Sequence, residues 1–323
     1  MYKTFYGLLK DPFEISPDPY FLVPTTRHNE ALANLFYGVR RQKGFVVLTG
    51  EVGTGKTLLV RCLLELLRRQ AQTASAYVFN PALSPLEFLQ YIMGDFGLRI
   101  LPSKGEMLLE LNRFLLARHQ RGLTTALVVD EGQLLEWDVL EEIRLLTNLE
   151  TAQQKLLQIV MVGQPELDGK LDSYELRQLK QRIALRCRLE ALTLDETKAY
   201  IQRRLQQAGN ADPHQTIFPE ATVASVHELS HGIPRLINTI CANALVTAFA
   251  RQSRIVVPAI VLDVAGDFRL NQAVPAPSGN GSGHKLELQG VIKQLCRVAD
   301  MLERTQRLGP NSSESFITRS QTA

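Results

Sequence analysis

One octapeptide constrains the fold of this chain more than any other feature. Residues 50–57 read Gly-Glu-Val-Gly-Thr-Gly-Lys-Thr, a complete GxxxxGK[ST] pattern. A short apolar run, Phe45–Leu48, comes directly before it, and a helical pattern follows. Glycines in such a strand-to-helix turn allow backbone N–H groups to surround phosphate oxygens, and the helix N-terminus adds positive potential. The pattern therefore predicts a phosphate-binding loop (P-loop) at the start of an α/β fold.

The P-loop predicts a role for several of its residues. Lys56 would reach the β- and γ-phosphates of a nucleotide, and Thr57 would ligate Mg²⁺. The nucleotide-binding residues expected from the loop and the first helical turn are Gly50, Glu51, Val52, Gly53, Thr54, Gly55, Lys56, Thr57 and Leu58.

The residues around the P-loop alternate between short apolar runs and longer helical patterns. The runs are 44–49, 76–79, 125–129, 157–162 and 185–189. The helical patterns between them fall near 56–70, 85–96, 105–121, 137–151 and 174–183. Short strands that are buried on both faces and separated by helices indicate a parallel sheet. We therefore predict a three-layer α/β/α nucleotide-binding core with five parallel strands over residues 44–190.

The rest of the chain divides by composition and periodicity. Residues 1–43 form a Pro-rich N-terminal segment and a helix leading into the core, and residues 191–268 have only helical patterns, which predict a small helical lid domain. Residues 269–284 have the composition of a flexible linker. Residues 285–308 predict an amphipathic helix with a coiled-coil seam, and residues 309–323 a disordered tail.

Acidic side chains follow the third apolar run. Leu127–Val129 is followed by Asp130 and Glu131, which matches a Walker B element. An Asp at the carboxyl end of this strand would hold Mg²⁺ across the sheet from the P-loop, and the adjacent Glu would polarise the attacking water. Taken alone the pattern is also typical of a strand-to-helix cap, but its distance from the P-loop favours the functional interpretation.

Amides close two other strands. Gln164 ends the fourth apolar run and Asn80 ends the second. Both would lie beside the γ-phosphate, because ligands bind at the carboxyl ends of the strands in a doubly wound sheet. Asn80 precedes Pro81, so a simple turn is an equally good explanation for it.

Three arginines and one histidine complete the candidates. Arg182, at the end of a helix before the fifth strand, could reach the nucleotide of a neighbouring subunit, with Arg177 as the alternative. Arg235 follows Pro234 in the first turn of a helix, where the dipole disfavours a cation, so an anionic partner is expected. His28 could touch a base or ribose, although a local cap is equally plausible.

Composition excludes several other classes of protein. Lys and Arg number 36 against 33 Asp and Glu, so the net charge of +3 does not describe a dedicated polycation. The four cysteines form no CxxC pair, which argues against a zinc site or a disulfide framework. With no apolar run near 18 residues and no signal-peptide pattern, we expect a cytoplasmic protein without a membrane span.

Taken together, these motifs resemble those of an AAA+ ATPase, and in particular of the general secretion pathway protein A (ExeA-like) family. The resemblance covers roughly residues 1–268. The matching segments are Tyr2–Leu8, Pro12-Phe13, Pro17–Pro19, Phe21-Leu22, His28–Leu32, Gly44-Phe45, Thr49–Thr57, Asp130–Gln133, Val162–Leu167, Leu176–Ile183 and Gly232–Arg235.

The resemblance implies ATP and Mg²⁺ as cofactors and a role for each motif. Lys56 and Thr57 would belong to Walker A, and Asp130 and Glu131 to Walker B. Gln164 would be sensor 1, Arg235 sensor 2, Asn80 a switch for the catalytic glutamate and Arg182 the trans finger. The catalytic set is thus Glu131, Lys56, Gln164, Asn80, Arg182 and Arg235, with Thr57 and Asp130 on the metal.

The resemblance also implies an assembly and a cellular role. A homo-oligomer, either a hexamer-like ring or a filament, would couple ATP turnover to an envelope secretion, pilus or polysaccharide-export system. A partner could associate this oligomer with the inner membrane. The family's membrane helix and peptidoglycan-binding module have no counterpart in this sequence.

Two other interpretations stay open. A DNA-bound AAA+ regulator of transposition or replication initiation would use the basic stretches Arg40–Lys43, Arg68-Arg69 and Arg182–Arg188, although no helix-turn-helix or zinc element is evident. A scaffold that binds nucleotide without hydrolysing it is less favoured, because every catalytic position is filled.

Overall fold

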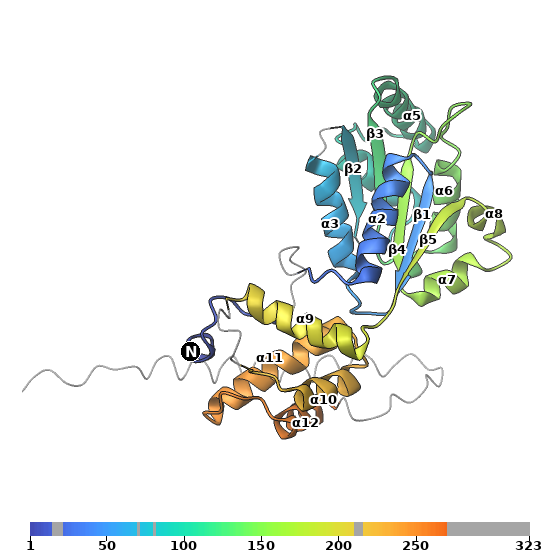
Figure 1. Ribbon diagram of the computed structural model, residues 1–323. Helices are drawn as coiled ribbons and strands as arrows, with labels where there is room; N and C mark the ends of the chain where they lie inside the picture. The colour runs from blue at the N-terminus through green and yellow to red at the C-terminus, as the bar shows by residue number, and fades with distance from the viewer. Residues whose placement is uncertain (15–21, 70–71, 80–81, 210–215, 270–323) are drawn as a thin grey trace, which may run out of the picture. The chain divides into compact units, whose positions relative to one another are not determined.

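The computed structural model describes residues 1–14, 22–69, 72–79, 82–209 and 216–269. Its centre is one sheet of five parallel strands in the order β2-β3-β4-β1-β5 (Figure 1). The strands are β1 (Phe45–Gly50), β2 (Thr73–Val78), β3 (Thr124–Val129), β4 (Gln158–Gly163) and β5 (Ile183–Leu189). The predicted α/β fold with a five-stranded parallel sheet is therefore confirmed.

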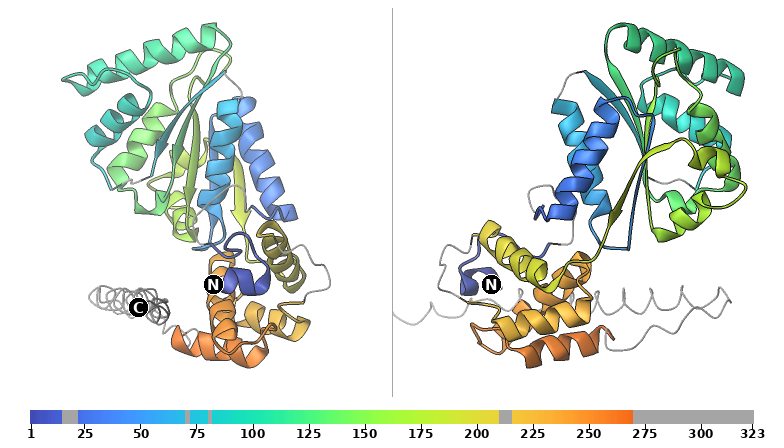
Figure 2. Two further views of the ribbon diagram at one scale, coloured as in Figure 1. Left: turned by 90° about the vertical axis from the view of Figure 1, so that its left-hand side faces the viewer. Right: turned by 45° about the vertical axis from the view of Figure 1, so that its right-hand side comes forward.

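Helices cover both faces of this sheet (Figure 2). On one face, α2 (Thr26–Arg40) and α3 (Lys56–Arg69) pack their apolar sides against alternate strand residues such as Val46 and Val160. On the other face lie α4 (Pro85–Asp95), α5 (Lys104–Gln120), α6 (Trp137–Leu146), α7 (Pro165–Leu171) and α8 (Arg177–Lys180).

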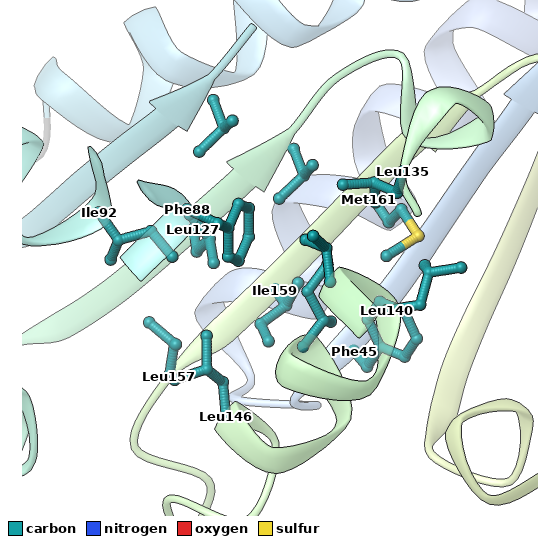
Figure 3. Close-up of a cluster of buried hydrophobic side chains, with 14 of the residues drawn as sticks. Phe45, Phe88, Ile92, Leu127, Leu135, Leu140, Leu146, Leu157, Ile159 and Met161 are labelled. Carbon is teal, nitrogen blue, oxygen red and sulfur yellow. The ribbon is translucent and has the colours of Figure 1, made fainter. Parts of the chain in front are cut away.

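The second face holds the larger of these two clusters of buried side chains. Phe88 and Ile92 of α4 and Leu140 of α6 pack on Leu127 and Ile159 of the central strands (Figure 3). Each of these side chains is almost fully excluded from solvent. Full burial of one such side chain contributes roughly 1.5–3 kcal/mol, so this cluster fixes the strands that carry the site.

Local signals in the sequence explain where the helices of the core and lid begin. The side chains of Ser84 and Ser103 each accept a hydrogen bond from the backbone N–H of the glutamate three residues later. The side chain of that glutamate in turn accepts a hydrogen bond from the backbone N–H of the serine. Thr193 starts α9 (Leu194–Gln207) with the same capping box. Each box satisfies backbone N–H groups that the first turn of a helix leaves unpaired.

A helical lid follows β5, formed by α9, α10 (Glu220–Ser230), α11 (Pro234–Ala250) and α12 (Pro258–Asp267). Residues before α2 take part in the hydrophobic core of the lid. Tyr6 of α1 (Tyr2–Tyr6) and Phe13 are buried among lid residues. The Tyr6 hydroxyl donates to the Ser253 carbonyl at 2.9 Å. The start of the chain therefore packs with the lid, whereas the helix that follows packs on the sheet.

Several elements differ from their predicted bounds. The helix predicted for 137–151 ends at Leu146, and the one predicted for 174–183 is a single turn, α8. Two short helices, α1 and α7, were not predicted. Among the predicted segments, Asn80, the linker beyond Arg269, the helix at 285–308 and the tail lie outside the described residues.

Candidate functional site

The P-loop joins β1 to α3 at the edge of the sheet where the strands end, which we call the carboxyl edge. Gly53 and Gly55 have positive φ of 84° and 101°, a conformation that favours glycine. A Cβ on Gly53 would lie 2.7 Å from the Cβ of Arg235, and one on Gly50 would lie 2.8 Å from the Leu189 carbonyl oxygen. The loop thus has the backbone conformation and the close surroundings that only glycine allows.

Lys56 is folded into this loop. Its ammonium donates to the carbonyl oxygens of Gly50 at 2.7 Å and Glu51 at 2.9 Å, and the residue is only 6% exposed. Burial lowers the pKa of Lys56, while the carboxylates of Glu131 and Asp130 oppose the shift. A phosphate group in the loop would add negative charge directly beside this desolvated cation.

Asp130 is a buried carboxylate that contacts the first helical turn after the loop. Its Oδ2 accepts from the Thr57 hydroxyl at 3.1 Å and from the Tyr77 hydroxyl at 3.1 Å. Its Oδ1 accepts the Glu131 backbone N–H at 2.9 Å. Burial raises the pKa of Asp130, and these hydrogen bonds act in the opposite direction. Carboxylate and hydroxyl oxygens at this separation are suited to hold Mg²⁺, which prefers oxygen ligands.

Glu131 has an unusual backbone conformation. Its φ of 54° and ψ of 36° lie in the left-handed region, and it precedes the single turn η2 (Gly132–Leu134). Such a conformation is costly for a non-glycine residue and is found preferentially at functional sites. Its carboxylate accepts from Gln133 Nε2 at 2.6 Å and lies 3.5 Å from Gln164 Nε2.

Gln133 links Glu131 to the end of β4. While its amide nitrogen donates to Glu131, its Oε1 accepts the backbone N–H of Gln164 at 2.9 Å. The predicted general base and the predicted sensor are therefore connected through one amide side chain. This connection orients the Glu131 carboxylate, which could otherwise turn toward solvent.

Two residues from outside the core contact the P-loop backbone. The N–H of Arg235, in the first turn of α11, donates to the Gly53 carbonyl at 3.2 Å, and its guanidinium is exposed. The buried His28 side chain has Nε2 3.0 Å from the Thr54 carbonyl oxygen and Nδ1 2.7 Å from the Thr25 hydroxyl. His28 thus supports the loop from behind instead of occupying a position open to a ligand.

The geometry of His28 defines its protonation. A carbonyl oxygen can only accept, so Nε2 carries the proton, and Nδ1 accepts from the Thr25 hydroxyl. Burial lowers the pKa of His28, which favours this neutral form.

The structure places the predicted site residues in two groups. Lys56, Thr57, Asp130, Glu131 and Gln164 come together at the carboxyl edge, with the Arg235 backbone on the loop. Arg182 instead donates to the Arg144 carbonyl at 2.8 Å and to the Thr147 hydroxyl, at the C-terminus of α6. Arg177 is exposed and stacks on Tyr174. Neither arginine contacts the P-loop in the described part of the chain.

Two residues of the site, Tyr77 and Gln133, were given no role from the sequence. Tyr77 belongs to an apolar strand, and only its register beside β3 brings its hydroxyl to Asp130. Gln133 stands in the segment that resembles the secretion family, but no side-chain pattern indicates that it joins Glu131 to Gln164. The contact of Tyr77 depends on strand pairing, and that of Gln133 depends on a tight turn. Neither feature produces a recognisable spacing of residues in the sequence.

The chain is similar to proteins of known sequence and known structure. A family model described as "AAA domain" matches residues 39–171. General secretion pathway protein A of Aeromonas hydrophila is 48% identical over 259 residues, which amount to 80% of this chain and 46% of that protein. The chain therefore spans about half the length of this relative.

Solved structures show the same fold at low sequence identity. Cdc6p from Pyrobaculum aerophilum matches with a TM-score of 0.62 and 19% identity, over 80% of this chain and 71% of that one. The Aeropyrum pernix ORC1 protein in complex with DNA matches with a TM-score of 0.60 and 19% identity, over 80% and 69% of the two chains. Residues 39–171 therefore form an AAA domain, and the chain is similar to General secretion pathway protein A over 80% of its own length.

Proposed function

We propose that this protein is a Mg²⁺-dependent ATPase. The observation that carries the proposal is the convergence of three groups at the carboxyl edge. These are the Lys56 ammonium inside a glycine loop, the Thr57–Asp130 oxygen pair and the Glu131 carboxylate held by Gln133. Catalysis of phosphoryl transfer depends on such positioning and charge neutralisation.

Each residue then has a distinct task. Backbone N–H groups of the loop and Lys56 would bind the phosphates, while Thr57 and Asp130 would hold the metal and its water shell. Glu131 would orient and polarise the attacking water. Gln164 would monitor the γ-phosphate, and the exposed Arg235 would do so from the lid.

Two further roles are proposed for residues outside the P-loop sequence. A neighbouring subunit would complete the site with an arginine, Arg182 or Arg177. Of the two, Arg177 is the more accessible, because Arg182 would first have to leave the end of α6. Asn80, which follows the second apolar run of the sequence and lies outside the described residues, would act as a switch for Glu131.

We propose that hydrolysis serves an envelope secretion, pilus or polysaccharide-export system through a homo-oligomer in the cytoplasm. Support comes from the similarity to a protein named for the general secretion pathway, over about half the length of that protein. In the described part of the chain, no helix is long and apolar enough to cross a membrane. Association with the inner membrane would then depend on a partner or on a surface.

The rival function is a DNA-bound AAA+ regulator. Its support is the fold shared with the DNA-bound Aeropyrum pernix structure. ATP turnover per protomer, measured against protein concentration with and without duplex DNA, separates the two. A rise with concentration that DNA does not change supports the secretion ATPase and a trans arginine. Strong stimulation by DNA supports the regulator, and absent turnover supports a scaffold that only binds nucleotide.

A further inference from the structure

Cationic side chains gather at the edge of the sheet opposite the nucleotide site. In a parallel α/β sheet, each covering helix runs against its strands, so its C-terminus lies where the next strand begins. We call this set of residues the basic edge: Arg40, Arg41 and Lys43 before β1, Arg68 and Arg69 before β2, and Arg121 before β3.

Most of these cations lack an internal partner. Arg69 pairs with Glu65, but the side chains of Arg40, Arg41, Arg68 and Arg121 make no ion pair or hydrogen bond among the described residues. Many arginines elsewhere are paired, for example Arg27 with Glu190 and Arg251 with Asp263. Another acidic group near this edge, Glu150, is paired with Lys155, which packs against Gly44.

The helix dipole explains only part of the basic edge. A cation in the last turn of a helix is favourable, which accounts for Arg40, Arg68 and Arg69. Lys43 and Arg121 lie beyond the last helical residue, so they gain less from the dipole. The basic edge therefore carries more positive charge than stabilisation by the helix dipoles accounts for.

The basic edge also has aromatic surface. Phe36 and Tyr37 line a shallow hollow together with Arg40 and Arg41, and Tyr37 is 47% exposed. The Lys43 ammonium lies 5.9 Å from the centre of the Tyr37 ring. An exposed tyrosine among cations is typical of protein surfaces that rest at the headgroup level of a membrane.

We propose that the basic edge docks the protein on an anionic phospholipid surface. The cations come from helices on both faces of the sheet. They extend from the start of β1 to the start of β2, and these two strands are three strand spacings, or roughly 14 Å, apart. The cations therefore form a broad surface. Nucleic-acid sites also use helix N-termini and backbone N–H groups, whereas this edge presents helix C-termini. Attraction to an anionic leaflet needs only flexible cations close to its surface.

This inference deepens the proposed envelope role and rests on it for its biological setting. It leaves the nucleotide site free, because Lys56 and Asp130 lie at the carboxyl edge of the same sheet. A protein held in this way would need no membrane-spanning helix of its own to work beside the membrane.

The test is flotation of the full chain with vesicles of phosphatidylcholine, with and without phosphatidylglycerol, at low and high salt. We expect binding only to the anionic vesicles, decreasing with salt. The Arg40→Gln/Arg41→Gln variant should lose about 25-fold in lipid partitioning, at about fivefold for each cation removed. The matched control, Arg203→Gln/Arg251→Gln, removes two exposed lid arginines and should bind like the unmodified protein.

Three results would overturn the inference: no preference for anionic vesicles, equal losses in the two variants, or duplex DNA bound by the Arg40/Arg41 surface more tightly than the vesicles. Circular dichroism confirms that each variant is folded. ATP turnover in the same samples separates the two proposals, because a protein that hydrolyses ATP without binding vesicles contradicts only the docking inference. A protein that binds vesicles without turnover contradicts only the proposed ATPase.

Discussion

At the scale of single residues, Asp130 depends on Tyr77 as well as on Thr57. Both hydroxyls lie 3.1 Å from the same carboxylate oxygen, and burial raises the pKa of Tyr77, so its hydroxyl stays protonated as a donor. Tyr77 is therefore a positioning residue for the carboxylate that would face the metal, although it does not itself touch the nucleotide site.

Removing this hydroxyl should affect the metal more than the nucleotide. A hydrogen bond to a charged group contributes about 1.5–3 kcal/mol, so Tyr77→Phe should raise the Mg²⁺ concentration needed for nucleotide binding by about tenfold or more. Titration of a fluorescent ADP analogue with Mg²⁺ and with EDTA measures this. Tyr174→Phe, at an exposed ring, is the control. An equal loss of affinity in EDTA would contradict the assignment.

His28 predicts a pH dependence of stability. Its folded-state pKa lies below the unfolded value near 6.5, so the unfolded chain takes up a proton first as the pH falls. The stability that neutral His28 contributes is therefore complete above about pH 6.5 and is lost as the pH falls toward the folded pKa.

Comparison with His28→Gln isolates this effect. Glutamine can still donate to the Thr54 carbonyl but does not titrate, so the variant should lose less stability than the unmodified protein between neutral and mildly acidic pH. Urea denaturation across this range measures the difference. Parallel curves for the two proteins would show that His28 does not titrate on unfolding.

At the scale of elements, the turn between α10 and α11 connects the lid to the end of β5. Gly232 has a φ of 70°, and its carbonyl accepts the Leu192 N–H at 2.8 Å. A Cβ at this position would lie 2.1 Å from the Leu192 carbonyl oxygen, which is backbone and cannot move alone. The turn therefore excludes any side chain, and it also places Arg235 against the P-loop.

Gly232→Ala should destabilise the protein by about 2 kcal/mol or more, from the clash and from the left-handed backbone. Its nucleotide affinity should fall as well, because α11 carries the Arg235 N–H that contacts Gly53. Gly266→Ala in α12 is the control: it meets no atom within 4 Å and should be neutral or slightly stabilising. Equal urea midpoints for the two variants would contradict this account.

The sequence predicted most of these elements, for identifiable reasons. Strands β1, β3 and β4 are buried along their whole length, so each appears as a continuous apolar run. Strand β2 begins at Thr73, earlier than predicted. Its first residues do not form an apolar run, because they are small or polar and only partly buried in an outer strand of the sheet. The short helix α7 contains too few turns to produce a periodic pattern.

Candidate site residues could be proposed from the sequence where one local pattern holds them, but not where their contacts are long-range. Lys56 and Thr57 belong to a contiguous loop, and Asp130 follows an apolar strand directly. Tyr77, Gln133 and His28 act through strand register, a tight turn and a distant helix, which no spacing in the sequence indicates.

At the scale of the whole molecule, the proposed catalytic carboxylates and the arginines of the basic edge lie at opposite ends of the strands. Carboxylates, including Asp130 and Glu131, lie at the edge where the strands end, and unpaired arginines lie at the edge where they begin. A net charge of only +3 conceals this separation. If both proposals hold, nucleotide chemistry takes place at one edge while the other edge contacts an anionic surface.

Glu131 is the residue that we propose activates water for ATP hydrolysis at this site. The most direct measurement is phosphate release by the unmodified protein and by Glu131→Gln, with binding of a fluorescent ATP analogue followed in the same samples. We predict that the variant binds ATP with affinity within about threefold of the unmodified protein while turnover falls by about 100-fold or more. Normal turnover by Glu131→Gln would contradict the account, and so would the absence of ATP hydrolysis by the unmodified protein at every concentration.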